Sequence, residues 1–189
     1  KKYLQICYDV CHFTLFSLNP YKTFQLFKKN FINIGKIQFS SSLKTKEPRS
    51  FYLKKKFYTD IKNINLKTQF LHQTKIFNET IKKQILLNDL KSILLKGNID
   101  FKKNNYNNNI LHYIIHYHIP IYKKTYKNYQ TTKKQLKIIT NIIKYSNYII
   151  PSLEIETYMW NTIKKSQKLN VINSLITEYN TIINLMNSL

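Results

Sequence analysis

The stretch IQFSSSLKTKEPRSFYLKKKFY, residues 37–58, decides the predicted fold. Its first three residues are typical of a strand, 40–48 is polar and turn-forming, and 50–58 has the aromatic residues that favour a partner strand. Two strands joined by such a turn form a β-hairpin. The sequence therefore predicts a long hairpin with lysines at its tip.

The segments around this hairpin predict alternating strands and helices. A first strand is expected over 3–10, followed by a helix that begins with Asn19 as N-cap and Pro20 as first helical residue and ends near Gly35. Its face would carry Phe24, Phe27 and Phe31. Later elements are a short helix within 70–80, a strand over 81–87, helical turns over 89–95 and a short strand over 99–101. This order favours an α+β fold with a ferredoxin-like split βαβ sheet and a protruding hairpin.

The character of the chain changes at the asparagine-rich stretch 104–109, which has little to bury and is typical of a linker. Beyond it lie an apolar, aromatic segment (110–122), a lysine-rich segment (123–134) and predicted helices over 132–148, 152–169 and 170–189. The last helix has a strong amphipathic pattern, so its apolar stripe should be buried against the preceding helices or against a partner protein. We expect a domain over 1–103, a linker over 104–109 and a mostly helical extension over 110–189.

Charge is the strongest feature of the composition. The chain has 31 Lys and Arg residues against 9 Asp and Glu, a formal net charge of +22, no alanine, and a single arginine, Arg49. Codon pressure in an AT-rich gene explains the missing alanine and part of the lysine excess. The remaining charge makes nucleic acid the leading partner, with an anionic membrane surface second. No apolar run is long enough to span a bilayer, so membrane insertion is not expected.

Two lysine clusters are candidate nucleic-acid-binding sites. The first lies on the predicted hairpin. The second begins at Lys123 and is interleaved with Tyr122, Tyr126 and Tyr129. Such basic segments can contact RNA phosphates, although an edge strand protected by charge or a solvated face gives the same pattern. The predicted RNA-binding residues are Lys44, Thr45, Lys46, Arg49, Lys54, Lys55 and Lys56 in the first cluster, and Lys123, Lys124 and Lys127 in the second.

Signals for catalysis or metal binding are weak. There is no glycine-rich phosphate loop, nucleophile motif or His-Glu metal motif, so an enzyme is not expected. His112, His116 and His118 could bind a metal, but no acidic partner other than Asp100 lies near them in the sequence, and aromatic-like packing is favoured instead. Cys7 and Cys11 are expected to be small core residues. No catalytic residue, metal site or cofactor is therefore predicted.

Three segments resemble small-subunit ribosomal protein ten, the family whose bacterial member is also called NusE, in its mitochondrial form. They are LKTK (43–46) with Arg49 and FYL (51–53), IFNETIKKQ (76–84), and LKSILLKGNIDF (90–101). The similarity covers about residues 3–103. The Ser-Pro-His of the family is replaced by Lys54, Lys55 and Lys56, and 104–189 has no counterpart.

The resemblance implies a structural component of the mitochondrial ribosome's small-subunit head. It would bind ribosomal RNA and neighbouring head proteins, with the hairpin inserted into RNA and Lys82 and Lys83 as further RNA contacts, and it would need no cofactor. No cleavable targeting segment is visible, which suits an organelle-encoded product in the mitochondrial matrix, and a plastid is the less favoured organelle. The alternatives are a peripheral scaffold subunit of an organellar respiratory membrane complex and a free-standing RNA-processing factor.

Overall fold

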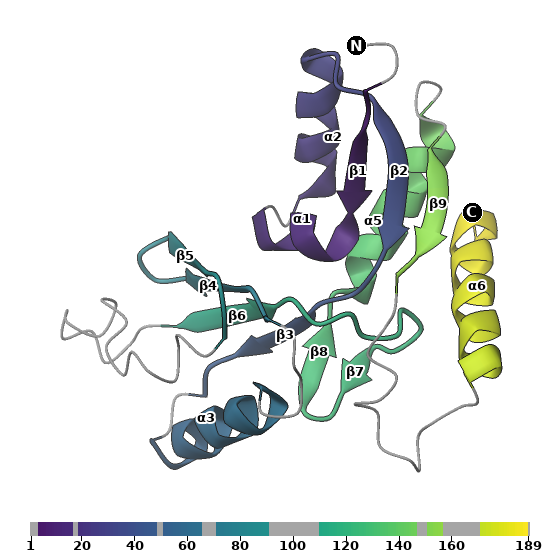
Figure 1. Ribbon diagram of the computed structural model, residues 1–189. Coiled ribbons are helices and arrows are strands. Elements are labelled where there is room, and N and C mark those ends of the chain that lie inside the picture. Colours follow the sequence, from purple (N-terminus) through teal and green to yellow (C-terminus); the bar gives the residue numbers. More distant parts are fainter. Residues whose placement is uncertain are drawn as a thin grey trace. The chain divides into compact units, whose positions relative to one another are not determined.

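The computed structural model describes residues 4–16, 19–48, 51–65, 71–90, 110–146, 151–156 and 171–188 (Figure 1). These residues form two compact units. Unit 1 contains 1–42 and 117–189, and unit 2 contains 43–116. Helices occur together with a parallel and an antiparallel sheet, which is compatible with the predicted α+β class.

Unit 1 is built on a parallel sheet with the strand order β1-β2-β9. Its first part runs from β1 (Ile6–Asp9) through helices α1 (Val10–Phe16) and α2 (Pro20–Lys29) to the parallel neighbour β2 (Ile34–Phe39). The helices thus supply the crossover that two adjacent parallel strands require. The later part of unit 1 contains β7 (Thr125–Tyr126), β8 (Tyr129–Thr131), α5 (Lys133–Tyr145), β9 (Ser152–Ile155) and α6 (Val171–Asn187).

The predicted helix after Pro20 is confirmed, and its N-cap is Asn19, whose side chain accepts a hydrogen bond from the Lys22 amide. The helix ends at Lys29 rather than near Gly35. Phe24 is buried in the core, but Phe31 lies beyond the helix end with a positive φ and is 88% exposed. The expectation that Phe31 shares the buried face is therefore wrong.

The core of unit 1 lies between the sheet and its helices. Tyr8 of β1 stacks on Phe13 of α1, with ring centroids 4.1 Å apart. Helix α5, predicted over 132–148, buries Leu136, Ile139 and Ile142 in the same cluster. Sheet and helices thus share one continuous apolar core, which stabilises the unit by removing these side chains from water.

Helix α6 confirms the predicted C-terminal helix but not the burial of its apolar stripe. It buries Ser174, Glu178 and Ile182, while Ile172, Ile176 and Ile183 are mostly exposed. The backbone amide of Ile121 donates to Glu178 Oε1 at 2.9 Å, so a polar contact helps to set the rotation of the helix. Among the described residues, no helix combines the length and the apolar character needed to cross a membrane.

Unit 2 is an antiparallel sheet with a helix on one face. Its strands are β3 (Leu43–Lys46), β4 (Thr74–Asn78), β5 (Lys83–Leu87) and β6 (Leu111–Ile115), paired in the order β5-β4-β6-β3. Helix α3 (Phe51–Asn65) packs on the sheet through Phe57, whose ring centroid lies 5.4 Å from that of Tyr113. Strand β6 belongs to the region predicted as a C-terminal extension, yet it pairs with both β3 and β4.

The predicted hairpin over 37–58 is wrong. Residues 43–46 form strand β3 instead of a turn, and 51–65 form helix α3 instead of a strand. Leu53, Phe57 and Ile61 recur at helical spacing, and Phe57 and Ile61 are buried, whereas Lys55 and Lys56 face solvent. A strand would turn alternate lysines of this run toward the core, and the helix avoids that cost.

Two predicted helices are replaced by strands. The segment within 70–80 contains β4, because Thr74 to Asn78 pair on both sides with β5 and β6. Residues 152–155 form β9, which pairs in parallel with β2. Each strand has a partner far away in the sequence, β6 for β4 and β2 for β9, which local propensity does not report. The ferredoxin-like arrangement is accordingly not confirmed.

Several predicted elements lie outside the described residues. They are the helical turns from 91 onward, the strand over 99–101, the linker over 104–109 and most of the helix over 152–169.

Candidate nucleic-acid interface

The structure distributes the predicted RNA-binding residues over several elements. Lys44, Thr45 and Lys46 lie on β3, Lys54, Lys55 and Lys56 on α3, Lys82 in the β4–β5 turn and Lys83 on β5. Lys123, Lys124 and Lys127 belong to unit 1, around the β7–β8 hairpin. Arg49 lies outside the described residues.

Strand register shows which of these side chains share a face of the unit 2 sheet. Lys46 pairs with His112, His112 with Phe77, and Phe77 with Gln84. Paired residues point to the same side of a sheet, so these four side chains form a row across it, which we call the basic strip. Lys44, two residues before Lys46, points to the same side.

The basic strip is accessible and carries aromatic rings. Lys46 and Gln84 are exposed, and His112 and Phe77 are half-buried. The rings of Phe77 and His112 have centroids 6.4 Å apart and are inclined by 36°. Rings of this kind at a sheet surface can stack on unpaired bases while neighbouring lysines contact phosphates.

The carboxylate of Glu79 lies beside the strip. His112 Nε2 lies 2.9 Å from Glu79 Oε2. The pKa of Glu79 is lowered, first by this hydrogen bond and further by the charges of His112, Lys46 and Lys82. The positive charges of Lys46 and Lys82 therefore both act on the Glu79 carboxylate.

The other predicted RNA-binding residues of unit 2 are not part of the strip. Thr45 pairs with Tyr113, which contacts α3, so it faces the helix-covered side. Lys83 alternates with Gln84 and faces the opposite side from the strip. Lys55 and Lys56 lie on α3 and are exposed there. The structure thus selects Lys44 and Lys46 from the first predicted cluster, and Lys82 from the two further contacts predicted with the family resemblance.

The second predicted cluster combines lysines with tyrosine rings, two of which are buried. Lys127 Nζ lies 5.5 Å from the centroid of the Tyr126 ring, and Lys123 Nζ lies 5.9 Å from that of Tyr122. Tyr126 and Tyr129 are buried in unit 1. Tyr126 and Tyr129 therefore stabilise the β7–β8 hairpin and are not available to stack on bases, whereas Tyr122 is half-buried.

Unit 1 holds a different group of polar residues at the carboxyl ends of its parallel strands. Asp9 ends β1, Ser40 follows β2 and Glu156 follows β9. His12 Nδ1 lies 3.2 Å from Asp9 Oδ2, and His118 Nδ1 lies 3.0 Å from the main-chain carbonyl oxygen of Glu156. We call Asp9, His12, His118 and Glu156 the carboxyl-end cluster.

The two carboxyl groups of this cluster differ in acidity. Burial raises the pKa of Glu156 to about 7, and hydrogen bonding to the charged Asp9 acts in the same direction. Burial opposes the charge of Asp9 too, but hydrogen bonds from His12 and Glu156 outweigh it and lower the pKa of Asp9. Asp9 therefore ionises first, and Glu156 keeps its proton to higher pH.

Sequence reasoning missed most of this cluster. It considered His118 only together with His112 and His116, whereas His112 lies in unit 2 beside Glu79. Asp9 lies near the end of the strand predicted over 3–10, which was a usable signal, because polar residues at strand carboxyl ends often meet at one sheet edge. Glu156 gave no such signal, because its segment was predicted to be helical. Cys11 is buried as expected, but Cys7 is exposed.

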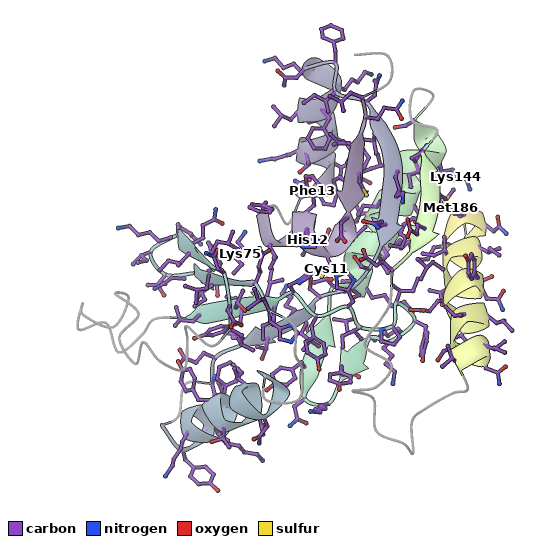
Figure 2. All side chains as sticks on the ribbon, in the orientation of Figure 1. Cys11, His12, Phe13, Lys75, Lys144 and Met186 are labelled. Atoms are coloured by element: carbon purple, nitrogen blue, oxygen red, sulfur yellow. The ribbon has the colours of Figure 1, made fainter. Side chains whose placement is uncertain are left out.

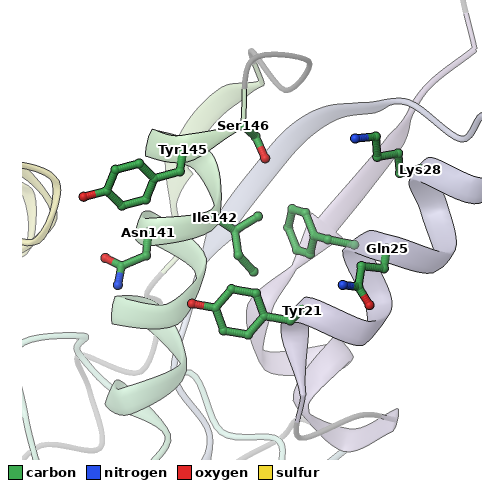
Figure 3. A pocket seen from close by; sticks show the side chains of 8 residues that line it. Tyr21, Gln25, Lys28, Asn141, Ile142, Tyr145 and Ser146 are labelled. Carbon is green, nitrogen blue, oxygen red and sulfur yellow. The ribbon is translucent and has the colours of Figure 1, made fainter.

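A groove with a volume of about 600 Å³ lies between helices α2 and α5 (Figure 3). Tyr21, Gln25 and Lys28 come from the α2 side, and Asn141 and Tyr145 from α5. The groove is open, and Tyr21 and Tyr145 are mostly exposed. The side chains that line it carry no acid–base pair and no set of metal ligands, so we assign it no chemistry.

Comparison with protein-family models, with curated protein sequences and with the solved structures finds no match for this chain.

Proposed function

We propose that the protein binds RNA as a component of a ribonucleoprotein, and that unit 2 provides the binding surface. The observation that carries the proposal is the basic strip, in which Lys46 lies in register with the rings of His112 and Phe77. Lysine would contact phosphates and the rings would stack on bases that are not paired. The net charge of +22 supports the same partner, since a polyanion relieves the repulsion.

The particle we propose is the small subunit of an organellar, mitochondrial ribosome, with neighbouring head proteins as further partners in the matrix. The similarity of 43–53, 76–84 and 90–101 to ribosomal protein ten supports this assignment. The ferredoxin-like sheet and the inserted hairpin of that family are not needed for it, because the basic strip offers another RNA contact. A structural role, rather than catalysis, is the function proposed.

RNA binding can be tested with the full chain and a fluorescent single-stranded oligoribonucleotide, titrated at several salt concentrations. The double variant Lys46→Gln/Lys82→Gln should weaken binding and reduce the slope of log affinity against log salt by about 1.4, because each phosphate contact on a single strand contributes about 0.7. The matched control is Lys28→Gln/Lys29→Gln, which removes two exposed lysines from α2 and should leave the slope nearly unchanged. Equal effects of the two double variants would remove the strip from the RNA site.

Ribosome membership has its own test. The protein should sediment with the small ribosomal subunit in gradients that contain magnesium. The alternative, a peripheral scaffold of a respiratory membrane complex, has one point in its favour, namely that a basic surface also binds anionic lipid. Sedimentation with membranes that is lost on adding detergent would support this alternative and contradict the ribosomal proposal.

A further inference from the structure

The carboxyl-end cluster places the side chains of Asp9, His12 and His118 close together in unit 1. One possible ligand atom from each of them lies within 4.8 Å of the other two. His12 lies on α1, directly after β1, where Figure 2 labels it. In sheets of parallel strands, ligands bind beyond the carboxyl ends, which is where Asp9 lies.

The carboxylate of Asp9 is oriented by contacts within unit 1. Its Oδ1 accepts hydrogen bonds from the hydroxyl of Ser40 at 3.1 Å and from the backbone amide of His12 at 2.9 Å. Its Oδ2 faces His12 Nδ1 at 3.2 Å. One oxygen is thus held by the fold, and the other is directed at the imidazole of His12.

The ring of His118 is oriented in the way that metal-binding histidines are. Its Nδ1 lies 3.0 Å from the carbonyl oxygen of Glu156, and a carbonyl can only accept, so Nδ1 is the protonated nitrogen. The lone pair of the neutral ring is then on Nε2. A histidine that binds a metal through one ring nitrogen usually donates a hydrogen bond from the other nitrogen, often to a carbonyl oxygen, and this bond fixes the orientation of the ring.

We propose that Asp9, His12 and His118 bind a divalent transition-metal ion of the zinc type. Two imidazoles and a carboxylate are ligands that Zn²⁺ accepts, at about 2.0–2.2 Å each, which separates tetrahedral ligand atoms by about 3.4 Å. The distance of 3.2 Å between His12 Nδ1 and Asp9 Oδ2 is already close to that value. A small movement of the half-exposed His12 ring would complete the site.

Glu156 supports the site from outside. Its main-chain carbonyl oxygen and its Oε2 lie 3.0 Å and 4.0 Å from His118 Nδ1, the ring nitrogen that faces away from the proposed ion. Glu156 therefore orients the His118 ring, and a water molecule would fill the fourth position of the tetrahedron. The competing explanation is a metal-independent network in which Asp9 caps α1 and pairs with His12.

The experiment uses the full chain, freed of metal with a chelator and then titrated with Co²⁺ and with Zn²⁺. We expect the visible absorption bands of tetrahedral Co²⁺, their loss on adding Zn²⁺, and a rise in melting temperature with Zn²⁺, because the ion binds the folded state. Absence of these bands, together with absence of Zn²⁺ uptake by calorimetry, would overturn the proposal in favour of the metal-independent network.

Variants locate the site. His118→Ala and His12→Ala should each weaken Zn²⁺ binding by more than about 100-fold. Ser40→Ala should weaken it by about 10-fold, because the Ser40 hydroxyl orients Asp9 without ligating the ion. The matched control is His112→Ala. His112 lies in unit 2, where it contacts Glu79, so its replacement should leave the Zn²⁺ affinity unchanged. Each variant is first melted in the presence of chelator. If His118→Ala does not fold, His12→Ala provides the test, because replacing the half-exposed His12 should leave the fold intact. An unchanged Zn²⁺ affinity in His12→Ala would contradict the assignment.

Discussion

The hydroxyl of Tyr58 donates a hydrogen bond of 2.6 Å to Glu47 Oε1 and thereby joins helix α3 to the segment that follows β3. The same hydroxyl lies 3.4 Å from that of Tyr113 on β6. Glu47 is buried, and the Tyr58 pKa is raised by burial and by the bond to Glu47. This contact helps to hold 51–65 as a helix against the sheet, where local sequence suggested a strand.

Replacing Tyr58 should therefore destabilise the protein. We expect Tyr58→Phe to lower the free energy of unfolding by about 1–3 kcal/mol, because the buried Glu47 loses a charge-assisted hydrogen bond. Urea unfolding measures the change. Tyr52→Phe is the control, since Tyr52 lies on the same helix with 77% of its surface exposed. A similar loss in both variants would show that the hydroxyl of Tyr58 has no special role.

Removing a ring from the basic strip should weaken RNA binding without changing its salt dependence. We expect Phe77→Ala to lower the affinity for single-stranded RNA by about 1–3 kcal/mol, the usual effect of losing one stacked base. No charge is lost, so the salt slope should stay the same. The measurement is fluorescence anisotropy, with the exposed Phe31→Ala as control. Unchanged affinity in Phe77→Ala would exclude stacking on this ring.

Glu178 should matter for stability through its acceptor oxygen. It is fully buried on α6 and accepts from the Ile121 amide, so Glu178→Ala leaves that amide without this acceptor. We expect a loss of about 1–3 kcal/mol in the free energy of unfolding. Glu178→Gln keeps an oxygen at the same place and should lose less. If chemical denaturation found Gln and Ala equally harmful, the hydrogen bond to Ile121 would not be the cause.

The rotation of α6 can be tested with two isoleucines of the same helix. Ile182 is buried in the core of unit 1, whereas Ile176 is about half exposed. Ile182→Asp should lower the melting temperature strongly, because it buries a charge, and Ile176→Asp should change it little. The opposite ranking in a thermal melt would mean that the apolar stripe, and not the Ser174–Glu178 side, faces the core.

The buried imidazole of His72 should make the protein less stable in acid. Burial lowers its pKa from 6.5, although the main-chain carbonyl of His116 and the charge of Asp89 act in the opposite direction. The unfolded chain then binds more protons than the native protein, so stability falls as pH decreases through about 6.5. His72→Gln should show a smaller loss of unfolding free energy between neutral and mildly acidic pH. Parallel pH curves for the two proteins would contradict this.

Local sequence determined the elements whose signals lie within a few residues. Asn19 and Pro20 define the start of α2, and the helical spacing of Leu136, Ile139 and Ile142 predicts α5, because capping and amphipathic periodicity act over one or two turns. Strand β5 falls within the predicted 81–87 segment for a similar reason. The charge of the chain is also a property of sequence alone.

Only the tertiary structure decided β3, β4 and β9, and with them both sites. β4 lies between its hairpin neighbour β5 and strand β6, and β9 pairs with β2; β6 and β2 lie far away in the sequence from the strands they pair with. The basic strip forms only when β3, β4 and β6 are paired, because this pairing aligns Lys46, His112 and Phe77. The same holds for the carboxyl-end cluster, in which the folded chain brings Asp9 close to His118. Backbone pairing between distant segments is a long-range interaction, and local propensity carries no information about it.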